Sequence, residues 1–239
     1  FLDLEEVALV DDLQDQLPHV VGLVRVVRDQ PVEGEVGPLR VVVGLDLGDL
    51  GRNAINPIIT DLVETPFEVL AGETVGALGQ PVAAVVARTA AIARDAALLV
   101  EIDIDPLPVA SGTAGPRSVE QVLTTGDPDA AFAGADHVGS VRIEHALVGP
   151  TPMEPRAALA VWDEEGLTAC CATQSHYRVR DDRGRIRGLP FDRVRVVAPD
   201  VGGAFGGKAS IDPEDVMVAF AARALGGAVK WCAMRGEDL

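Results

Sequence analysis

The chain has 239 residues, of which 48% are hydrophobic, and its 20 basic and 37 acidic side chains give a formal charge of −17. This apolar content is enough for a packed core, so the sequence predicts a globular protein with one large domain or two small ones. The acidic excess disfavours nucleic acid and anionic membrane surfaces as partners, because both are themselves negatively charged.

Cysteine and histidine usage gives little support for a metal site built from protein side chains. Cys170, Cys171 and Cys232 are too few for a disulfide framework, and we interpret them as buried thiols in a reducing, cytoplasmic compartment. The four histidines form no HExxH motif, and no CxxC pair is present. We therefore assign no metal ligand to the protein itself.

The most apolar stretch, residues 81–102, is interrupted by Arg88, Arg94 and Asp95. A membrane span needs a longer run without charges, so we expect none here. The chain begins with Phe1 and shows no secretory leader, which leaves open whether a segment was removed from its N-terminus.

Residues 1–70 predict β-structure without firm boundaries, from apolar runs such as VVGLVRVV and LRVVVGLDL. After Gln80, PVAAVVA predicts a short buried strand, Thr89 predicts the cap of a helix through AAIARDAALL, and VEIDIDPLP predicts an alternating strand. The segment ASGTAGPRS at 110–118 lacks apolar periodicity and predicts a linker between two modules.

The second module predicts strands and helices in alternation. DHVGSVRIEHALV predicts a strand, and ALAVW and LTACCA predict a hairpin joined by the acidic loop DEEG. HYRVRDDRGRIRGLP predicts a weak helix, formed only in part, because glycine at its centre costs about 1 kcal/mol relative to alanine. RVRVVA and AVKWCAM predict strands on either side of a helix at 213–225, which Asp212, Pro213 and Gly226 delimit.

A glycine loop, VGGAFGGKAS at 201–210, precedes that helix and nearly satisfies the phosphate-binding P-loop pattern. A P-loop needs a hydroxyl directly after its lysine and a helix that starts there, whereas Ala209 follows Lys208 and the helix signals begin at Asp212. The glycines at 202, 203, 206 and 207 still expose backbone amides, which suits an anionic or oxo ligand. The alternative is a plain tight connection between a strand and a helix.

Four segments carry a resemblance to a known family: GQPVAAVVARTAAIARDAALLVEIDIDPLP, PMEPRAALAVWDEEG, CATQ and VRVVAPDVGGAFGGKAS. In order and spacing they resemble the large, molybdenum-binding subunit of the xanthine dehydrogenase and aldehyde oxidase family, including the bacterial carbon monoxide dehydrogenase branch. The resemblance implies an α+β fold, with a hammerhead-type α/β domain at 1–112 and the first part of a molybdopterin-binding α+β domain at 113–239.

The resemblance also implies a molybdenum hydroxylase, which oxidises an aldehyde, an N-heterocycle or a related small molecule with water-derived oxygen. Its cofactor would be molybdopterin, in the cytosine dinucleotide form, carrying molybdenum. Electrons would leave through a 2Fe–2S centre on an iron-sulfur small subunit and FAD on a medium subunit. The cofactor performs the difficult chemistry in such an enzyme, while the protein orients it.

By this resemblance, Gln174 is the amide that approaches an oxygen ligand of molybdenum, and its NH2 is a suitable donor. Gly203, Ala204, Phe205 and Gly206 match the turn whose backbone lies against the metal's ligands, with Phe205 facing the substrate. Gln174 and Phe205 are therefore the candidate catalytic residues, and all five are candidates for cofactor binding. Taken alone, Gln174 would be an ordinary polar residue and Phe205 a core ring.

Other residues of these motifs receive no catalytic role. The signature from Met153 to Arg156 is interpreted as structural, and Lys208 as solvated or bonded to a helix cap. Ala209 stands where purine-oxidising members place a substrate-binding glutamate, which argues against a xanthine-type substrate.

The resemblance places the family's catalytic glutamate beyond Leu239, so we expect the chain to be inactive as an enzyme by itself. The alternative hypothesis is a noncatalytic scaffold or truncated remnant that binds the partner subunits.

Overall fold

The structure is a computed structural model that describes residues 4–10, 21–27, 40–43, 47, 52–53, 62–63, 67–77, 79–108, 119–146, 148–187 and 189–238. Its strands are β1 (Leu4–Val10), β2 (Val21–Val27), β3 (Arg40–Val43), β4 (Arg52–Asn53), β5 (Phe67–Glu68), β6 (Thr74–Val75), β7 (Ala83–Ala87), β8 (Glu101–Leu107), β9 (Ala157–Asp163), β10 (Gly166–Cys171), β11 (Val194–Val197) and β12 (Ala228–Cys232). Its α-helices are α2 (Ala90–Ala97), α3 (Pro128–Ala133), α4 (His176–Arg187) and α5 (Pro213–Leu225). The α+β class predicted from the sequence is confirmed.

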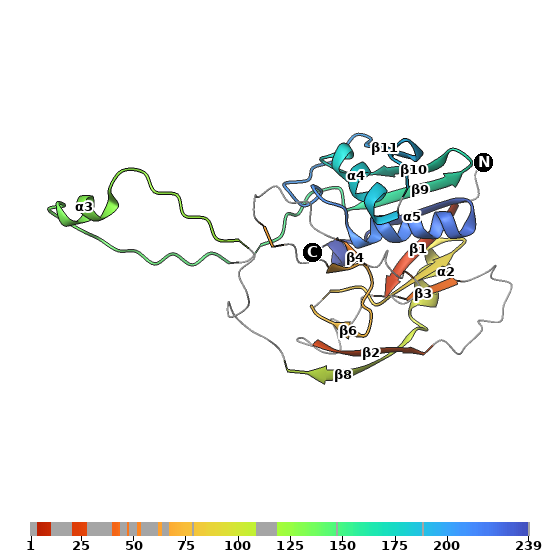
Figure 1. The fold of residues 1–239 in the computed structure, drawn as a ribbon. Coiled ribbons are helices and arrows are strands. Elements are labelled where there is room, and N and C mark those ends of the chain that lie inside the picture. The colour runs from red at the N-terminus through yellow and green to blue at the C-terminus, as the bar shows by residue number, and fades with distance from the viewer. Residues whose placement is uncertain are drawn as a thin grey trace.

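The largest sheet has seven strands in the order β11-β10-β9-β12-β1-β7-β3 (Figure 1). Strand β1 runs parallel to β12 on one side and antiparallel to β7 on the other. Strands from both halves of the chain therefore share one sheet across the predicted boundary, and the division into 1–112 and 113–239 stays a prediction.

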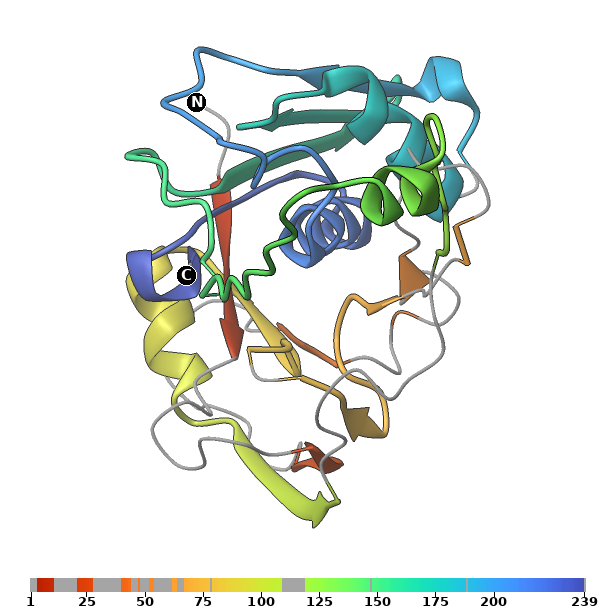
Figure 2. The ribbon, with the colours of Figure 1, turned by 90° about the vertical axis from the view of Figure 1, so that its left-hand side faces the viewer.

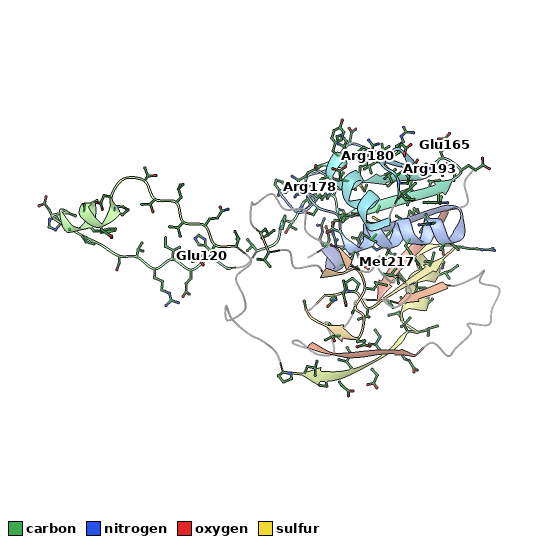
Figure 3. The ribbon with its side chains drawn as sticks, viewed as in Figure 1. Glu120, Glu165, Arg178, Arg180, Arg193 and Met217 are labelled. Atoms are coloured by element: carbon green, nitrogen blue, oxygen red, sulfur yellow. The ribbon has the colours of Figure 1, made fainter. Side chains whose placement is uncertain are left out.

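The hairpin β9–β10 is confirmed. The two strands are antiparallel, with Asp163 paired to Gly166 around a tight turn that contains Glu165 (Figure 3). Asp163 accepts hydrogen bonds from the backbone N–H groups of Glu165 and Gly166, which closes the turn. Gly166 has φ 127, and a Cβ there would collide with the carbonyl oxygen of Arg193 on the way into β11. This close approach explains why the turn ends in glycine.

Helix α5 covers the sheet at β9, β10 and β12 and supplies much of the core. Its N-terminus carries a capping box between Asp212 and Asp215, and Gly226 ends the helix in the left-handed region at φ 66. Met217 points into the packed interface and is fully buried (Figure 3). Every signal that predicted this helix is thus confirmed.

The first half of the chain forms the opposite end of the molecule, with the small sheet β6-β2-β8 farthest from β9–β11 (Figure 2). Strand β7 is buried along its whole length, as predicted. The predicted helix is α2, and the Thr89 hydroxyl accepts from the Ile92 N–H at 3.2 Å. Strands β2, β3 and β8 confirm the β-structure expected of their segments, whereas the predicted linker at 110–118 lies outside the described residues.

Two local predictions need correction. Residues 136–148 were expected to form a strand, but those that are described have no strand partner and lie in a segment that projects from the body (Figure 1).

The cysteines also differ from one another, since Cys171 is buried, Cys170 half-buried and Cys232 exposed. The general prediction of buried thiols is therefore wrong for Cys232.

Helix α4 occupies residues 176–187 of the weakly helical stretch 176–190. Val179 anchors it in the core, and the Arg180 guanidinium stacks on the Phe191 ring and donates to the Phe191 carbonyl. These contacts with the following turn compensate for the poor intrinsic helix propensity of the segment.

The helices within the described ranges are all too short or too polar to cross a bilayer.

Candidate functional site

The glycine loop connects β11 to α5 and follows an unusual backbone path. Gly203 and Gly206 have φ 99 and 95, and Phe205 between them has φ 52. Among the described residues Phe205 is the one non-glycine with positive φ, a conformation that costs an L-residue about 1–2 kcal/mol. Phe205 is 78% exposed, so burial of the side chain does not compensate for that cost. The surrounding structure must hold this loop in place.

Gln174 holds the C-terminal end of the loop. Its side-chain oxygen Oε1 accepts hydrogen bonds from the N–H of Gly206 at 3.1 Å and from the N–H of Lys208 at 3.3 Å. The backbone N–H of Gln174 donates to the carbonyl of Lys208 at 2.9 Å, and Thr173 Oγ1 donates to the same carbonyl at 3.1 Å. Because two donors fix Oε1, the amide NH2 of Gln174 is directed away from them and has no acceptor within the described ranges.

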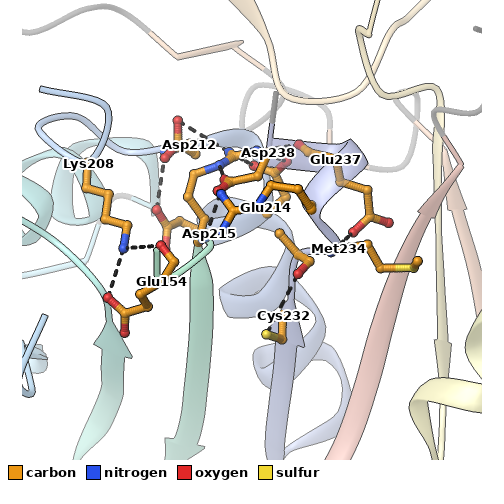
Figure 4. A network of polar contacts seen from close by, with 12 residues as sticks. Glu154, Lys208, Asp212, Glu214, Asp215, Cys232, Met234, Glu237 and Asp238 are labelled. Atoms are coloured by element: carbon orange, nitrogen blue, oxygen red, sulfur yellow. Dashed lines mark hydrogen bonds and ion pairs between the residues drawn. The ribbon is translucent and has the colours of Figure 1, made fainter. Parts of the chain in front are cut away.

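Glu154 and Lys208 together hold the N-terminal end of the glycine loop, at Gly202. The carboxylate oxygen Oε2 of Glu154 accepts from the N–H of Gly202 at 2.7 Å and from Lys208 Nζ at 2.9 Å (Figure 4). Lys208 Nζ also donates to the Glu154 carbonyl at 2.9 Å, and its side chain is only 2% exposed. The expectation of a solvated or cap-bonding lysine is therefore wrong. We call Glu154 and Lys208 the loop clamp.

The surroundings of Glu154 in the loop clamp favour its ionised form, which pairs with Lys208. The hydrogen bond from Lys208 holds the pKa of Glu154 below its usual value, against a smaller opposing effect of burial, and the Gly202 N–H adds to the lowering. A side chain at position 202 is excluded, since its Cβ would lie 2.6 Å from the Cβ of Glu154. Glycine at this position is thus required by the close approach of the clamp.

The backbone N–H groups of the loop fall into two sets. Those of Gly202 and Gly206 are bonded to Glu154 and Gln174, and that of Gly207 donates to the Ala204 carbonyl at 2.9 Å. These three are not available to a ligand, contrary to the expectation from the sequence. The N–H groups of Gly203, Ala204 and Phe205 have no acceptor in the part of the chain that the structure describes.

Three consecutive free amides on a backbone with alternating hand form a concavity that binds anionic or oxo groups. The NH2 of Gln174 adds a side-chain donor at the same loop. The structure thus brings together the five residues proposed from the sequence. It places the ring of Phe205 in solvent, not in the core that its residue type alone would suggest.

A second polar network is built around Arg156, and Figure 4 labels its partners Glu214 and Asp238. Its guanidinium donates to both carboxylate oxygens of Glu214, at 2.8 and 3.2 Å, and from Nε to Asp238 at 2.8 Å. It also lies 3.6 Å from Asp212 and over the ring of Trp231. Arg156 therefore ties the start of β9 to the N-terminus of α5 and to the turn Arg235–Asp238.

The pKa values of Asp212 and Glu214 in this network are raised, whereas that of Glu154 is lowered. Burial raises the pKa of Asp212 to about 7, assisted by the neighbouring Asp215 and Glu214 and opposed by Arg156. Burial likewise raises the pKa of Glu214. Arg156 thus offsets only part of the cost of placing several acids at one helix N-terminus.

Comparison with known proteins supports the family resemblance found in the sequence. Residues 113–239 match the family model of the molybdopterin cofactor-binding domain, and residues 19–108 match that of the aldehyde oxidase and xanthine dehydrogenase a/b hammerhead domain. The chain belongs to the xanthine dehydrogenase and aldehyde oxidase family.

Relatives in this family include the nicotine 6-hydroxylase large subunit of Paenarthrobacter nicotinovorans, 34% identical over 72% of this chain and 23% of the relative. The carbon monoxide dehydrogenase large chain of Hydrogenophaga pseudoflava is 33% identical over 72% of this chain and 25% of its own length. The crystal structure of quinoline 2-oxidoreductase from Pseudomonas putida 86 superposes with a TM-score of 0.83 at 27% identity, over 98% of this chain and 31% of that one. The chain spans about a quarter of the curated relatives it matches.

The loop clamp was missed by sequence reasoning as a feature of the site. Glu154 and Lys208 stand in recognisable motifs, but they are 54 residues apart and no local pattern pairs them. Likewise, the signature from Met153 to Arg156 was interpreted as structural without naming the partners of Arg156, which lie 58 and 82 residues away.

Replacing Lys208 by Met should lower the free energy of unfolding by about 2–3 kcal/mol, because the carboxylate of Glu154 would lose a buried, charged hydrogen-bond partner. Chemical denaturation measures this loss. Lys230→Met, at the half-buried lysine of β12, is the matched control, and we expect it to cost less than about 1 kcal/mol. Equal losses in the two variants would show that the clamp does not stabilise the loop.

Asp212→Asn should change how stability depends on pH, since Asn keeps an N-cap oxygen but cannot ionise. A carboxyl whose pKa rises from 3.8 to about 7 on folding contributes stability below pH 4 that is lost as the pH rises to about 7. The variant should therefore gain stability relative to the wild type between these pH values. Denaturation at several pH values tests this, with Asp129→Asn on the exposed helix α3 as the control. Parallel curves for Asp212→Asn and wild type would contradict it.

Proposed function

We propose that this chain forms part of the large subunit of a molybdenum hydroxylase, and that the loop at 202–208 and Gln174 contact the molybdenum–pterin cofactor. The observation that supports this most directly is the set of three consecutive free amides at Gly203, Ala204 and Phe205, beside the free NH2 of Gln174. Family membership supports the identity of the group, because the matching domain is one that binds molybdopterin.

The residues present fit such a group. An oxygen-rich ligand needs donors and no competing carboxylate. Among the described residues, the carboxylate that bonds to the loop is that of Glu154, which is already paired with Lys208 and Gly202. When bound, the cofactor would supply a two-electron oxidation that uses water-derived oxygen. The contribution of this chain would be to position that group and to donate hydrogen bonds to it.

Each residue then has a distinct role. Gln174 would hold the loop through Oε1 and donate to the ligand through Nε2. Gly206 would contribute through its backbone path at φ 95, since its N–H is already bonded to Gln174. Phe205 would present its exposed ring as an apolar wall for the substrate. We assign no general base to this chain.

We further propose an aldehyde, an N-heterocycle or a related small molecule as the substrate. Ala209 places a methyl group where a purine-binding carboxylate would be needed, which disfavours xanthine-type compounds. The cytosine dinucleotide form of the cofactor, the FAD and 2Fe–2S partner subunits and a cytoplasmic location complete the proposal. The names of relatives support its subunit part, since they are described as large subunits or large chains.

The test of the proposal is the molybdenum and cytidylate content of the protein purified from its source with the subunits that accompany it. About one of each per chain is the expected result, because the loop donors would then be occupied by the cofactor. Molybdenum can be measured by elemental analysis and cytidylate after acid release. Absence of both would favour the alternative, a noncatalytic scaffold or remnant that binds the partner subunits.

Gln174→Glu separates the two functions of that side chain. A carboxylate can still accept from the N–H groups of Gly206 and Lys208, but it has no NH2 to donate. We expect turnover to fall about 100- to 1,000-fold, as for loss of one donor near a reacting group, and molybdenum content to fall as well, because the new carboxylate competes with the oxygen-rich ligand. Gln174→Ala, which loses both functions, should also loosen the loop. Unchanged turnover in Gln174→Glu would remove the donor role.

A further inference from the structure

The carboxylate of Asp238 is buried and joins two arginines. Its side chain is only 3% exposed. The oxygen Oδ1 accepts hydrogen bonds from the backbone N–H of Arg156 at 3.3 Å and from Nε of the same residue at 2.8 Å. The oxygen Oδ2 lies 3.5 Å from Nη1 of Arg235, whose Nη2 donates to the carbonyl of Met153 at 2.9 Å. One carboxylate thus fixes the backbone at residue 156 directly and, through Arg235, at residue 153.

Glu154 of the loop clamp lies between these two fixed points and bonds reciprocally to the glycine loop. Its carboxylate accepts from the N–H of Gly202 at 2.7 Å, and its own N–H donates to the Gly202 carbonyl at 3.3 Å. Hydrogen bonds weaken steeply when their distance or angle changes, so a displacement of the Glu154 backbone would weaken both. The path of the loop at Gly202 therefore depends on how the backbone at 153–156 is held.

The turn that carries Asp238 is held in shape by its own hydrogen bonds. Glu237 accepts from the N–H of Met234 at 2.6 Å through Oε2, and its own N–H donates to the Met234 carbonyl at 3.0 Å (Figure 4). The Glu237 carbonyl accepts from Nη2 of Arg156 at 3.0 Å, and the Arg156 carbonyl accepts from the N–H of Ala233 at 3.0 Å. The turn directly follows β12, the middle strand of the large sheet. It thus gives residues 153–156 a fixed support on a rigid scaffold.

We propose that Asp238 is a positioning residue for the glycine loop, acting through Arg156 and Arg235 on the backbone that carries Glu154. Within the described ranges, the side chain of Asp238 bonds to these two arginines and to no residue of the loop, so its action is indirect. The effect on the loop rests on these contacts alone. The consequence for a molybdenum–pterin group rests on the proposed function, because that proposal places the group at the loop.

Neutralisation of Arg156 does not by itself explain why a second acid is buried beside it. Glu214 already accepts from the guanidinium through both carboxylate oxygens, at 2.8 and 3.2 Å. Asp238 adds two contacts that Glu214 does not make, namely the bond to the backbone N–H of Arg156 and the link to Arg235. Both of these contacts fix backbone next to Glu154, which is the function that we assign to Asp238.

Two variants of Asp238, each purified from the source with its accompanying polypeptides, test the proposal by hydrogen exchange and mass spectrometry. Asp238→Leu keeps a side chain of similar size but has no oxygen, so the amides of residues 202–208 should exchange at least about 10-fold faster than in the wild type. Asp238→Asn keeps an oxygen that can accept from Arg156, and its loop should exchange within about 3-fold of the wild type. Unchanged loop exchange in Asp238→Leu, or an equal increase in both variants, would overturn the proposal.

Asp163→Ala is the control for a general loss of stability. Asp163 lies at the opposite end of β9 from Glu154 and accepts from two backbone N–H groups, those of Glu165 and Gly166. Peptides from the buried strand β7 report opening of the whole protein in every variant. Relative to β7, loop exchange in Asp163→Ala should equal that of the wild type. Should the loop open as far in this control as in Asp238→Leu, reduced stability would explain the effect and the positioning role would be refuted.

Molybdenum measured in the same samples separates this inference from the proposed function. We expect about one molybdenum per chain in the wild type and less in Asp238→Leu, because a displaced loop holds its ligand less well. A faster-exchanging loop in Asp238→Leu without molybdenum in the wild type would refute the proposed function and leave the positioning of the loop intact. Molybdenum in the wild type with full retention in Asp238→Leu, despite a faster-exchanging loop, would refute the role of Asp238 toward the cofactor.

Discussion

Two acceptors, the carboxylate of Glu154 and the side-chain oxygen of Gln174, hold the glycine loop between β11 and α5 at its two ends. The loop would not keep its path without them, because Phe205 lies in a backbone region that L-residues avoid. By taking the N–H groups at 202, 206 and 208, the two acceptors determine which N–H groups remain for a ligand. The site is therefore defined as much by the amides that are occupied as by those that are free.

The topology of the sheet explains why these residues meet. Glu154 precedes β9 and Gln174 follows β10, and because β9 and β10 are antiparallel, both lie at the same end of the pair. Strand β11 is parallel to β10, so the loop that follows it emerges at that end as well. Three segments that are far apart in the sequence thus reach one rim of the sheet, where a rigid scaffold positions a functional loop.

Sequence reasoning succeeded where the signals are local. Helix α5, with its acidic cap and terminal glycine, and the hairpin β9–β10 were predicted because each carries its determinants within a few residues. The family resemblance likewise identified Gln174 and the turn at 203–206 as a unit. The burial of Lys208 could not be predicted, since a lysine is ordinarily solvated and its partner lies 54 residues earlier.

The strand expected at 136–148 shows a different limit. Its alternating pattern is real, as the Arg142–Glu144 pair demonstrates, but a strand exists only where another strand provides hydrogen bonds. A pattern in one segment cannot tell whether that partner is available. For the same reason, residues 1–70 predicted β-structure without predicting that β1 would lie between β12 and β7.

The position of β1 in the large sheet determines when that sheet can close while the protein is being synthesised. Leu4 pairs with Ala228 in a parallel ladder, so β1 is separated from one of its two neighbours by more than 200 residues of sequence. Residues 4–10 leave the ribosome before β12 does and can pair with β7 in that interval, so the large sheet closes only after β12 has emerged. During that interval the free edge of β1 is open to wrong partners, because closing so long a loop is slow. A nascent chain of this protein is thus expected to depend on chaperones at that edge until β12 has emerged.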